Sequence, residues 1–193
     1  MEESKISEDF IAILKQAQKN ETLVSVYADL EDVSHFDIGK PRWISAEEVV
    51  IESYDTYGHF DGFCWLLLED IFRIDIKGRY ERKIELLHKS NSQMVDRLPS
   101  LNKNVSLLAQ MLQYAVANML VVEIEQGGSG SVDLQGYIVE VQCSSAAVRL
   151  LSNYGEDDGM SQFKFSSVSK LRVNSTDGRA LAYLNTCSNE SNI

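Results

Sequence analysis

Apolar residues in this chain recur at two spacings, one typical of helices and one typical of strands. Near the start, four residues form a stripe with helical spacing: Phe10, Ile11, Leu14 and Ala17. Ser7 precedes this stripe and can serve as a helix N-cap, and a second, more apolar stretch with the same spacing follows Asn104. The pattern therefore predicts two helices, over residues 7–18 and 104–119.

Short runs that alternate apolar and polar residues follow each predicted helix. Alternation of this length, interrupted by glycine and aspartate, predicts strands of a half-buried antiparallel sheet. The predicted strands after the first helix are 23–28, 48–54, 63–68, 71–76 and 83–87. Those after the second helix are 120–125, 136–142, 147–154, 161–167, 168–173 and 180–184.

One short stretch of sequence occurs twice. "YGHFDG" at residues 57–62 returns 97 residues later as "YGEDDG" at residues 154–159. With the same shift, apolar positions of the first half fall on apolar positions of the second, as Ile51 does on Val148. We therefore interpret the chain as one module written twice. In each copy Asp-Gly is expected to supply the positive φ angles of a tight hairpin turn.

The segment between the two copies is polar and lacks any sustained period. It contains Pro99, and a stretch of this kind is ordinary between two modules but unusual inside one compact domain. The predicted organisation is a helix with a first small β-barrel over 1–90, a linker over 91–103, and a second helix and barrel over 104–193.

A helix followed by about five short strands resembles the Sm-like small β-barrel. "LLLEDIFRIDI", residues 66–76, is similar to the last strand, short turn and strand of such barrels. The resemblance implies a mainly β fold with helices (α+β), built from two tandem small Sm-like barrels, each preceded by an α-helix. The RNA-contacting signatures of that family, an aspartate with an asparagine and an Arg-Gly pair, do not occur at the corresponding stretches.

Composition and charge narrow the function. The chain has 193 residues, 44% of them hydrophobic and 24% charged, with a net charge of -11. An acidic balance disfavours nonspecific binding to nucleic acid, because phosphate affinity comes largely from lysine and arginine. We expect a cytoplasmic chain with no membrane segment, because no apolar run approaches the length of a bilayer crossing and the three cysteines suit no disulfide framework.

No motif in the sequence assembles a catalytic or metal site. The three histidines, His35, His59 and His88, have no metal-ligand spacing with one another or with a cysteine. The glycine-rich run at 127–131 lacks the lysine and the following helix of a phosphate loop. We therefore predict a protein that is not an enzyme and that carries no cofactor.

Two sets of residues are candidates for contacts with a partner. Aromatic residues of the first copy whose equivalents in the second are mostly polar form the predicted protein-contact surface: Trp43, Phe60, Trp65, Phe72 and Tyr80. On this view Trp65→Ser should leave the fold intact and abolish assembly. Basic residues placed on the last strands form the predicted phosphate or RNA contacts: Arg73, Arg79, Arg82, Lys170, Arg172 and Arg179.

The sequence therefore predicts a non-enzymatic interaction or regulatory protein, such as an adaptor, an inhibitor or an immunity-type protein. Its expected partner is another protein or a second copy of itself, in an oligomer. The alternative is an Sm-like RNA-binding protein that uses the basic strip, with nucleic acid the less favoured partner. Steep loss of binding with salt would distinguish RNA binding from protein binding.

Overall fold

The computed structural model describes residues 2–91 and 99–191, and side chains over 9–90 and 99–188. The chain forms two compact units, residues 1–107 and 108–193. Each unit is described by itself below.

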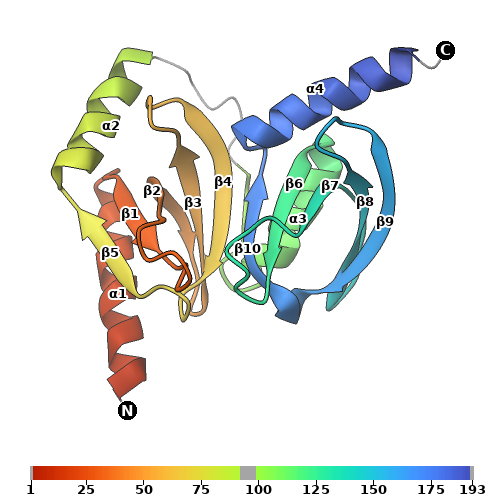
Figure 1. Cartoon of the computed structure of the whole chain (residues 1–193). Helices are drawn as coiled ribbons and strands as arrows, with labels where there is room; N and C mark the ends of the chain where they lie inside the picture. Colours follow the sequence, from red (N-terminus) through yellow and green to blue (C-terminus); the bar gives the residue numbers. More distant parts are fainter. Residues whose placement is uncertain (1, 92–98, 192–193) are drawn as a thin grey trace. The chain divides into compact units, whose positions relative to one another are not determined.

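Unit 1 is an antiparallel sheet with one helix before its first strand and one after its last strand (Figure 1). Its elements are α1 (Glu2–Lys19), β1 (Val24–Tyr27), β2 (Asp37–Ile44), β3 (Glu48–Tyr54), β4 (Phe60–Leu67), β5 (Arg73–Ile76) and α2 (Arg79–Asn91). The strand order is β5-β1-β2-β3-β4. Leu14 of α1 packs in a core cluster with Val24 and Val26, whereas Ile84 of α2 packs in another cluster with Leu23. Because neighbouring strand residues point to opposite faces, α1 and α2 cover opposite faces of the sheet.

Unit 2 repeats this arrangement (Figure 1). Its elements are α3 (Leu107–Asn118), which begins at the boundary, β6 (Val121–Gln126), β7 (Leu134–Val141), β8 (Ser145–Leu151), β9 (Asp157–Lys164), the short 3-10 helix Phe165–Ser167, β10 (Val168–Val173) and α4 (Thr176–Ser191). The strand order is β10-β6-β7-β8-β9. Leu181 of α4 packs against Val121 and Leu151, so α4 covers one face of this sheet.

The predicted pair of closed Sm-like barrels is wrong. Both sets of strands lie in open antiparallel sheet, and within the described residues the outer strands of each unit do not pair to close a barrel. Alternation along a sequence predicts strands and their faces. Closure depends in addition on strand tilt and stagger, which alternation does not encode. The α+β composition, mostly sheet with helices, agrees with the structure.

Some predicted elements are also wrong. Residues 83–87 and 180–184 were expected as strands but belong to α2 and α4. Short apolar runs fit both periods, and here Ile84 and Leu181 pack on the core from helices. The first helix begins at Glu2, so Ser7 lies inside it, and α3 begins at Leu107, three residues after the expected cap.

The two units match strand by strand. β2, β3 and β4 begin and end 97 residues before β7, β8 and β9. The irregularities of pairing match as well, since both sheets shift register at equivalent places. In unit 1 these are between Pro41 and Trp43 and between Glu52 and Tyr54; in unit 2 they are between Ile138 and Glu140 and between Arg149 and Leu151. Such bulges bend a strand locally, so both sheets bend at the same points.

The recurring hexapeptide has a structural explanation. Gly58 has a φ of +80°, and a Cβ there would lie 2.6 Å from the backbone nitrogen of His88 in α2. Gly155 has a φ of +76° and would meet Asn185 of α4 at the same distance. Each turn therefore packs tightly on the following helix, which only glycine permits.

Asp-Gly in this hexapeptide does not form the hairpin turn, contrary to the sequence-based expectation. The turn spans residues 55–59, where Asp55 N donates to His59 O at 3.0 Å. Gly62, with a φ of +78°, lies inside β4 at the point where the register shifts. The positive φ thus belongs to a bulge rather than to the turn.

A buried hydrogen bond joins strand and helix in both units, with its two partners exchanged. In unit 1, Ser25 of β1 donates to Glu81 in the first turn of α2. In unit 2 the acid lies on the strand, and Ser175, just before α4, donates to Glu123 of β6 at 2.5 Å. Ser25 and Glu123 hold equivalent positions in the two sheets. Ser25 follows Val24, which pairs with Gly39 of β2, and Glu123 follows Val122, which pairs with the equivalent Gly136 of β7. The exchange preserves the buried hydrogen bond, which would be costly to lose.

The two equivalent turns are held by different side chains. In unit 1, Asp55 Oδ1 accepts hydrogen bonds from the backbone nitrogens of Tyr57 at 2.8 Å and His59 at 2.9 Å. Burial raises the pKa of Asp55, but the hydrogen bonds from His59 and Tyr57 hold that pKa below its ordinary value. In unit 2, Ser152 takes this role and does not ionise.

We expect acid to open the first turn and to leave the second unchanged. Because the pKa of Asp55 is lowered by folding, its stabilisation is complete above the unfolded pKa of about 3.9 and is lost as pH falls through the folded pKa. Amide-exchange protection of Tyr57 and Tyr154, measured by NMR from about pH 5 to about pH 2, checks this. Asp55→Ser, which copies unit 2, should remove the difference; equal acid sensitivity of both turns in the unchanged chain would contradict it.

Candidate functional site

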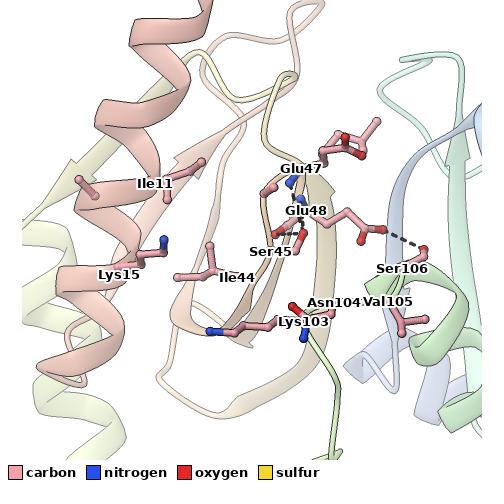
Figure 2. Close-up of a pocket in the computed structure, with 13 residues that line it drawn as sticks. Ile11, Lys15, Ile44, Ser45, Glu47, Glu48, Lys103, Asn104, Val105 and Ser106 are labelled. Carbon is pink, nitrogen blue, oxygen red and sulfur yellow. Dashed lines mark hydrogen bonds between the residues drawn. The ribbon is translucent and has the colours of Figure 1, made fainter.

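An open depression of about 1000 Å³ lies on unit 1 and is the candidate site (Figure 2). Its walls come from three segments that are distant in sequence: one face of α1, the turn between β2 and β3, and residues 103–106. Leu67, at the end of β4, completes the lining. The depression thus depends on the fold of the whole unit.

The turn between β2 and β3 is fixed by the side chain of Ser45. Its Oγ accepts hydrogen bonds from the backbone nitrogens of Glu47 at 3.2 Å and Glu48 at 2.9 Å, and the backbone nitrogen of Ser45 donates to Glu48 O at 2.9 Å. Serine favours such turns because its short hydroxyl reaches nearby backbone amides. The wall formed by this turn is therefore well defined.

Glu48 anchors the segment that forms the third wall. Its carboxylate accepts hydrogen bonds from Trp65 Nε1 at 3.1 Å and from the backbone nitrogen of Leu107 at 2.7 Å. It also accepts a hydrogen bond from Ser106 Oγ at 3.1 Å (Figure 2). All three donors belong to unit 1. Glu48 is thus committed to holding residues 103–107 in place, and it is not a free acid or base.

The two sides of the depression differ in charge. Lys15 and Lys103 lie on the side of α1 and Ile44, whereas Glu47 lies on the opposite side, near Glu48 (Figure 2). Among the described residues, neither lysine takes part in a salt bridge. A bound group with its negative end toward the lysines would be favoured here.

The depression also has apolar walls. Ile11 and Leu67 are half-buried, and Val105 is 54% exposed. Apolar side chains flanked by charges of opposite sign are typical of surfaces that bind another chain. In the described part of the chain, the one carboxylate that a lining hydroxyl contacts is Glu48, and besides Ser106 it accepts hydrogen bonds from Trp65 and Leu107, so this pair holds residues 103–107 in place.

A buried charged group of unit 1, Glu52, has a structural role. Glu52 is 2% exposed and accepts hydrogen bonds from Arg42 Nε at 2.6 Å and from the Tyr54 hydroxyl. Burial raises the pKa of Tyr54, and the Glu52 carboxylate raises it further. Burial alone would lower the pKa of Arg42, but Glu52 and Glu21 raise it. This cluster stabilises the sheet and does not line the depression.

The predicted aromatic contact residues lie in several places. Trp65 is 2% exposed, so its side chain is not on a free surface of the chain, whereas Phe72 is 36% exposed. Trp43 and Phe60 are half-buried and both pack edge-on against Phe63. Tyr80 is half-buried against Phe36. None of the five lines the depression, and their contact with a partner stays a prediction.

The predicted basic residues of unit 1 do not form one strip on the strands. Arg73 lies on β5, where it donates to Asp75 at 2.9 Å and stacks over the ring of Tyr27. Arg79 and Arg82 are exposed on α2 instead of on a strand. The misplacement follows from reading residues 83–87 as a strand.

The predicted basic residues of unit 2 are divided in the same way. Lys170 of β10 is 4% exposed, and its Nζ lies 3.6 Å from Glu125. Arg172 is half-buried on β10, and Arg179 lies on α4, where it donates to Asn174 O. A buried lysine paired with a carboxylate cannot reach a phosphate without breaking that pair.

Other kinds of site receive no support from the described part of the chain. Within residues 2–91 and 99–191, no group of three or more histidine, cysteine, aspartate or glutamate residues could hold a metal ion. The cysteines are not in disulfide bonds: Cys64 is buried, Cys143 exposed and Cys187 half-buried. None of the helices in this part of the chain is long and apolar enough to cross a bilayer.

Comparison with known proteins assigns no family. No protein-family model, no curated protein and no solved structure matches the chain. The resemblance to the Sm-like family stays a prediction, and the proposals below depend on the geometry alone.

The sequence did not indicate the depression. Lys15 is an ordinary exposed lysine of an amphipathic helix, and Lys103 was placed at the end of a linker. The one available signal was the acidic pair Glu47 and Glu48 after Ser45, where an acid could hold a distant amide. Only the fold brings these residues to one surface.

Proposed function

We propose that this protein binds another protein chain and that the depression of unit 1 is its docking surface. The observation that carries the proposal is the arrangement of Lys15 and Lys103 opposite Glu47 across apolar walls. An extended segment with an acidic side chain at one end and apolar side chains behind it would satisfy this arrangement. The opposed charges would fix the direction in which the segment binds.

A duplicated module fits a role in interaction. We infer that the units are copies of one ancestral module, because strands, register shifts and tight glycines recur at a constant spacing. The depression is made from residues of unit 1, so one copy would carry the docking surface. The proposed role is regulatory or adaptor-like and non-enzymatic.

The proposed compartment is the cytoplasm. Three cysteines outside disulfide bonds, one of them exposed, suit a reducing compartment. Binding of RNA is the competing function, and it needs basic residues that act together. The paired states of Arg73 and Lys170 favour protein over RNA, and the experiment below separates the two.

The test compares affinity capture by three forms of the full-length chain from a native extract treated with nuclease. We expect the unchanged chain to retain a protein partner and Lys15→Glu/Lys103→Glu to bind it about tenfold or more weakly, because both reversed charges would repel the acidic segment. The retained partner would then be purified, and its affinity for each form measured by calorimetry.

A matched control separates local from overall charge. Lys19→Glu/Lys83→Glu makes the same change of net charge at two exposed residues outside the depression. This control should bind as the unchanged chain does. Equal weakening by both double variants would refute the docking surface, and capture that disappears with nuclease would favour RNA binding.

A further inference from the structure

One strand at the end of the sheet order is unusually accessible. β9 (Asp157–Lys164) pairs with β8, and in the described part of the chain no strand pairs with its other side. Six of its eight residues are exposed, while Phe163 is buried at 4%. An unpaired edge of this length presents a row of backbone donors and acceptors to another strand.

The direction of the backbone groups follows from the neighbouring hydrogen bond. Phe165 N donates to Ser144 O of the chain before β8 at 2.9 Å, so the backbone groups of residue 165 face β8. Because these directions alternate along an antiparallel strand, the groups of Met160 and Gln162 face the open edge, whereas the carbonyl of Lys164 accepts a hydrogen bond from Ser167 Oγ at 2.8 Å. The backbone groups that face the open edge therefore lie in the regular part of β9, after the register shift near residues 158–159.

The outer strand β5 of unit 1 is better protected. β5 has only four residues, and Arg73 and Asp75 form an ion pair on it. The middle of β9, residues 160–163, carries no charge and no proline, and Met160 is 65% exposed. Charges and short length are the usual devices against edge pairing, and the centre of β9 lacks both.

The charges at the ends of β9 complement each other when the strand is reversed. Asp157 and Asp158 lie at its start, and Lys164 lies at its end. An antiparallel pairing with an identical strand, centred on Ser161, brings Asp158 of each copy to the level of Lys164 of the other, at the irregularity next to the regular part of the strand, while Asp157 is paired with Arg149. Met160 then lies opposite Gln162, both with outward backbone groups. Opposite charges across such a pair are stabilising.

We propose that two copies of the chain form a two-fold dimer through antiparallel pairing of their β9 strands. The pairing is isologous, so each favourable contact occurs twice. This inference goes beyond the docking surface of unit 1, because no residue of β9 lines that depression. Either proposal can therefore fail without the other.

The first test is the mass of the full-length chain in solution, measured by sedimentation equilibrium. We expect twice the 21.7 kDa of one chain, and a monomer for Gln162→Pro. Proline removes the outward N–H of residue 162, which makes no hydrogen bond to β8, so the sheet of unit 2 should remain. Circular dichroism of the variant checks that the fold is retained.

The second test uses complementary charge exchange. Asp158→Lys and Lys164→Glu each place like charges together in a dimer with themselves, so each should be monomeric. Mixed in equal amounts, the two variants should form a heterodimer, because every facing pair is again opposite in charge. Lys83→Glu, at an exposed residue of α2, is the control and should remain dimeric.

The outcomes are decisive in both directions. Restored dimers in the mixture would establish the β9 contact and its register. A monomeric unchanged chain would overturn the proposal. So would dimers that persist in both single variants and in Gln162→Pro, since another surface would then hold the copies together.

Discussion

Trp65→Ala is expected to lower the free energy of unfolding by about 3 to 5 kcal/mol, the usual cost of removing a large aromatic side chain from a core. Trp65 is 2% exposed, and its Nε1 donates to Glu48 at 3.1 Å. The variant loses this packing and leaves the Glu48 carboxylate with fewer donors. The sequence-based expectation, that Trp65→Ser would leave the fold intact, is therefore replaced by its opposite.

Urea unfolding measured by circular dichroism and by fluorescence checks this result. The chain has two tryptophans, Trp43 and Trp65, both in unit 1, so Trp43 remains as a probe in the variant. Trp43→Ala is the matched control: Trp43 is half-buried, so its removal should cost less. An unchanged unfolding midpoint for Trp65→Ala would contradict the burial of that side chain.

Arg42→Met is expected to lower the free energy of unfolding by about 3 kcal/mol, because it removes the cation from a buried ion pair. Glu52 is 2% exposed, and its carboxylate lies 2.6 Å from Arg42 Nε. Without the guanidinium, the buried Glu52 carboxylate keeps the hydrogen bond from the Tyr54 hydroxyl but has lost its paired cation. The expected loss of free energy of unfolding is at the lower end of the range usual for breaking a buried ion pair, because the Arg42 side chain is itself 18% exposed.

Two further variants test the cause of this effect. Arg42→Met/Glu52→Gln should recover part of the loss, since it no longer buries an unpaired charge. Arg149→Met breaks an ion pair of unit 2, with Asp157 at 3.2 Å, whose side chains are 33% and 60% exposed. Arg149→Met should lower the free energy of unfolding by less than about 1 kcal/mol. Similar losses for Arg42→Met and Arg149→Met would show that burial of Glu52 does not decide the cost.

Much of the strand pattern could be predicted from the sequence. β3 coincides with a predicted strand and β8 overlaps one over residues 147–151, because alternating apolar residues were sustained there. α2 was not predicted, because the short run at 83–87 fits a strand as well as a helix. Closure of the sheets was also predicted wrongly, since strand alternation does not encode strand tilt.

The contrast between the aromatic residues of the two halves coincides with a difference in burial. Trp65 and Gln162 occupy equivalent positions of β4 and β9. Residues 62–66 of β4 are buried, whereas most of β9 is exposed. The aromatic residue therefore marks burial in one strand, and the polar one marks exposure in the other. Sequence alone does not separate a buried aromatic from one on a contact surface.

The depression on unit 1 could not be predicted from local patterns. Lys15 and Lys103 are far apart in the sequence, and neither has a distinctive neighbourhood. Their common surface depends on the turn held by Ser45 and on the anchor provided by Glu48. Sites assembled from isolated residues of three segments leave no motif, in contrast to a metal or phosphate site.

The common path of the two units is the central claim, and long-range NMR contacts in the full-length chain test it most directly. Duplication predicts cross-strand contacts between Gly39 and Ser53 and, 97 residues later, between Gly136 and Leu150, with register shifts at equivalent places in both sheets. A different strand order or register in residues 121–173 from that in residues 24–76 would contradict the claim.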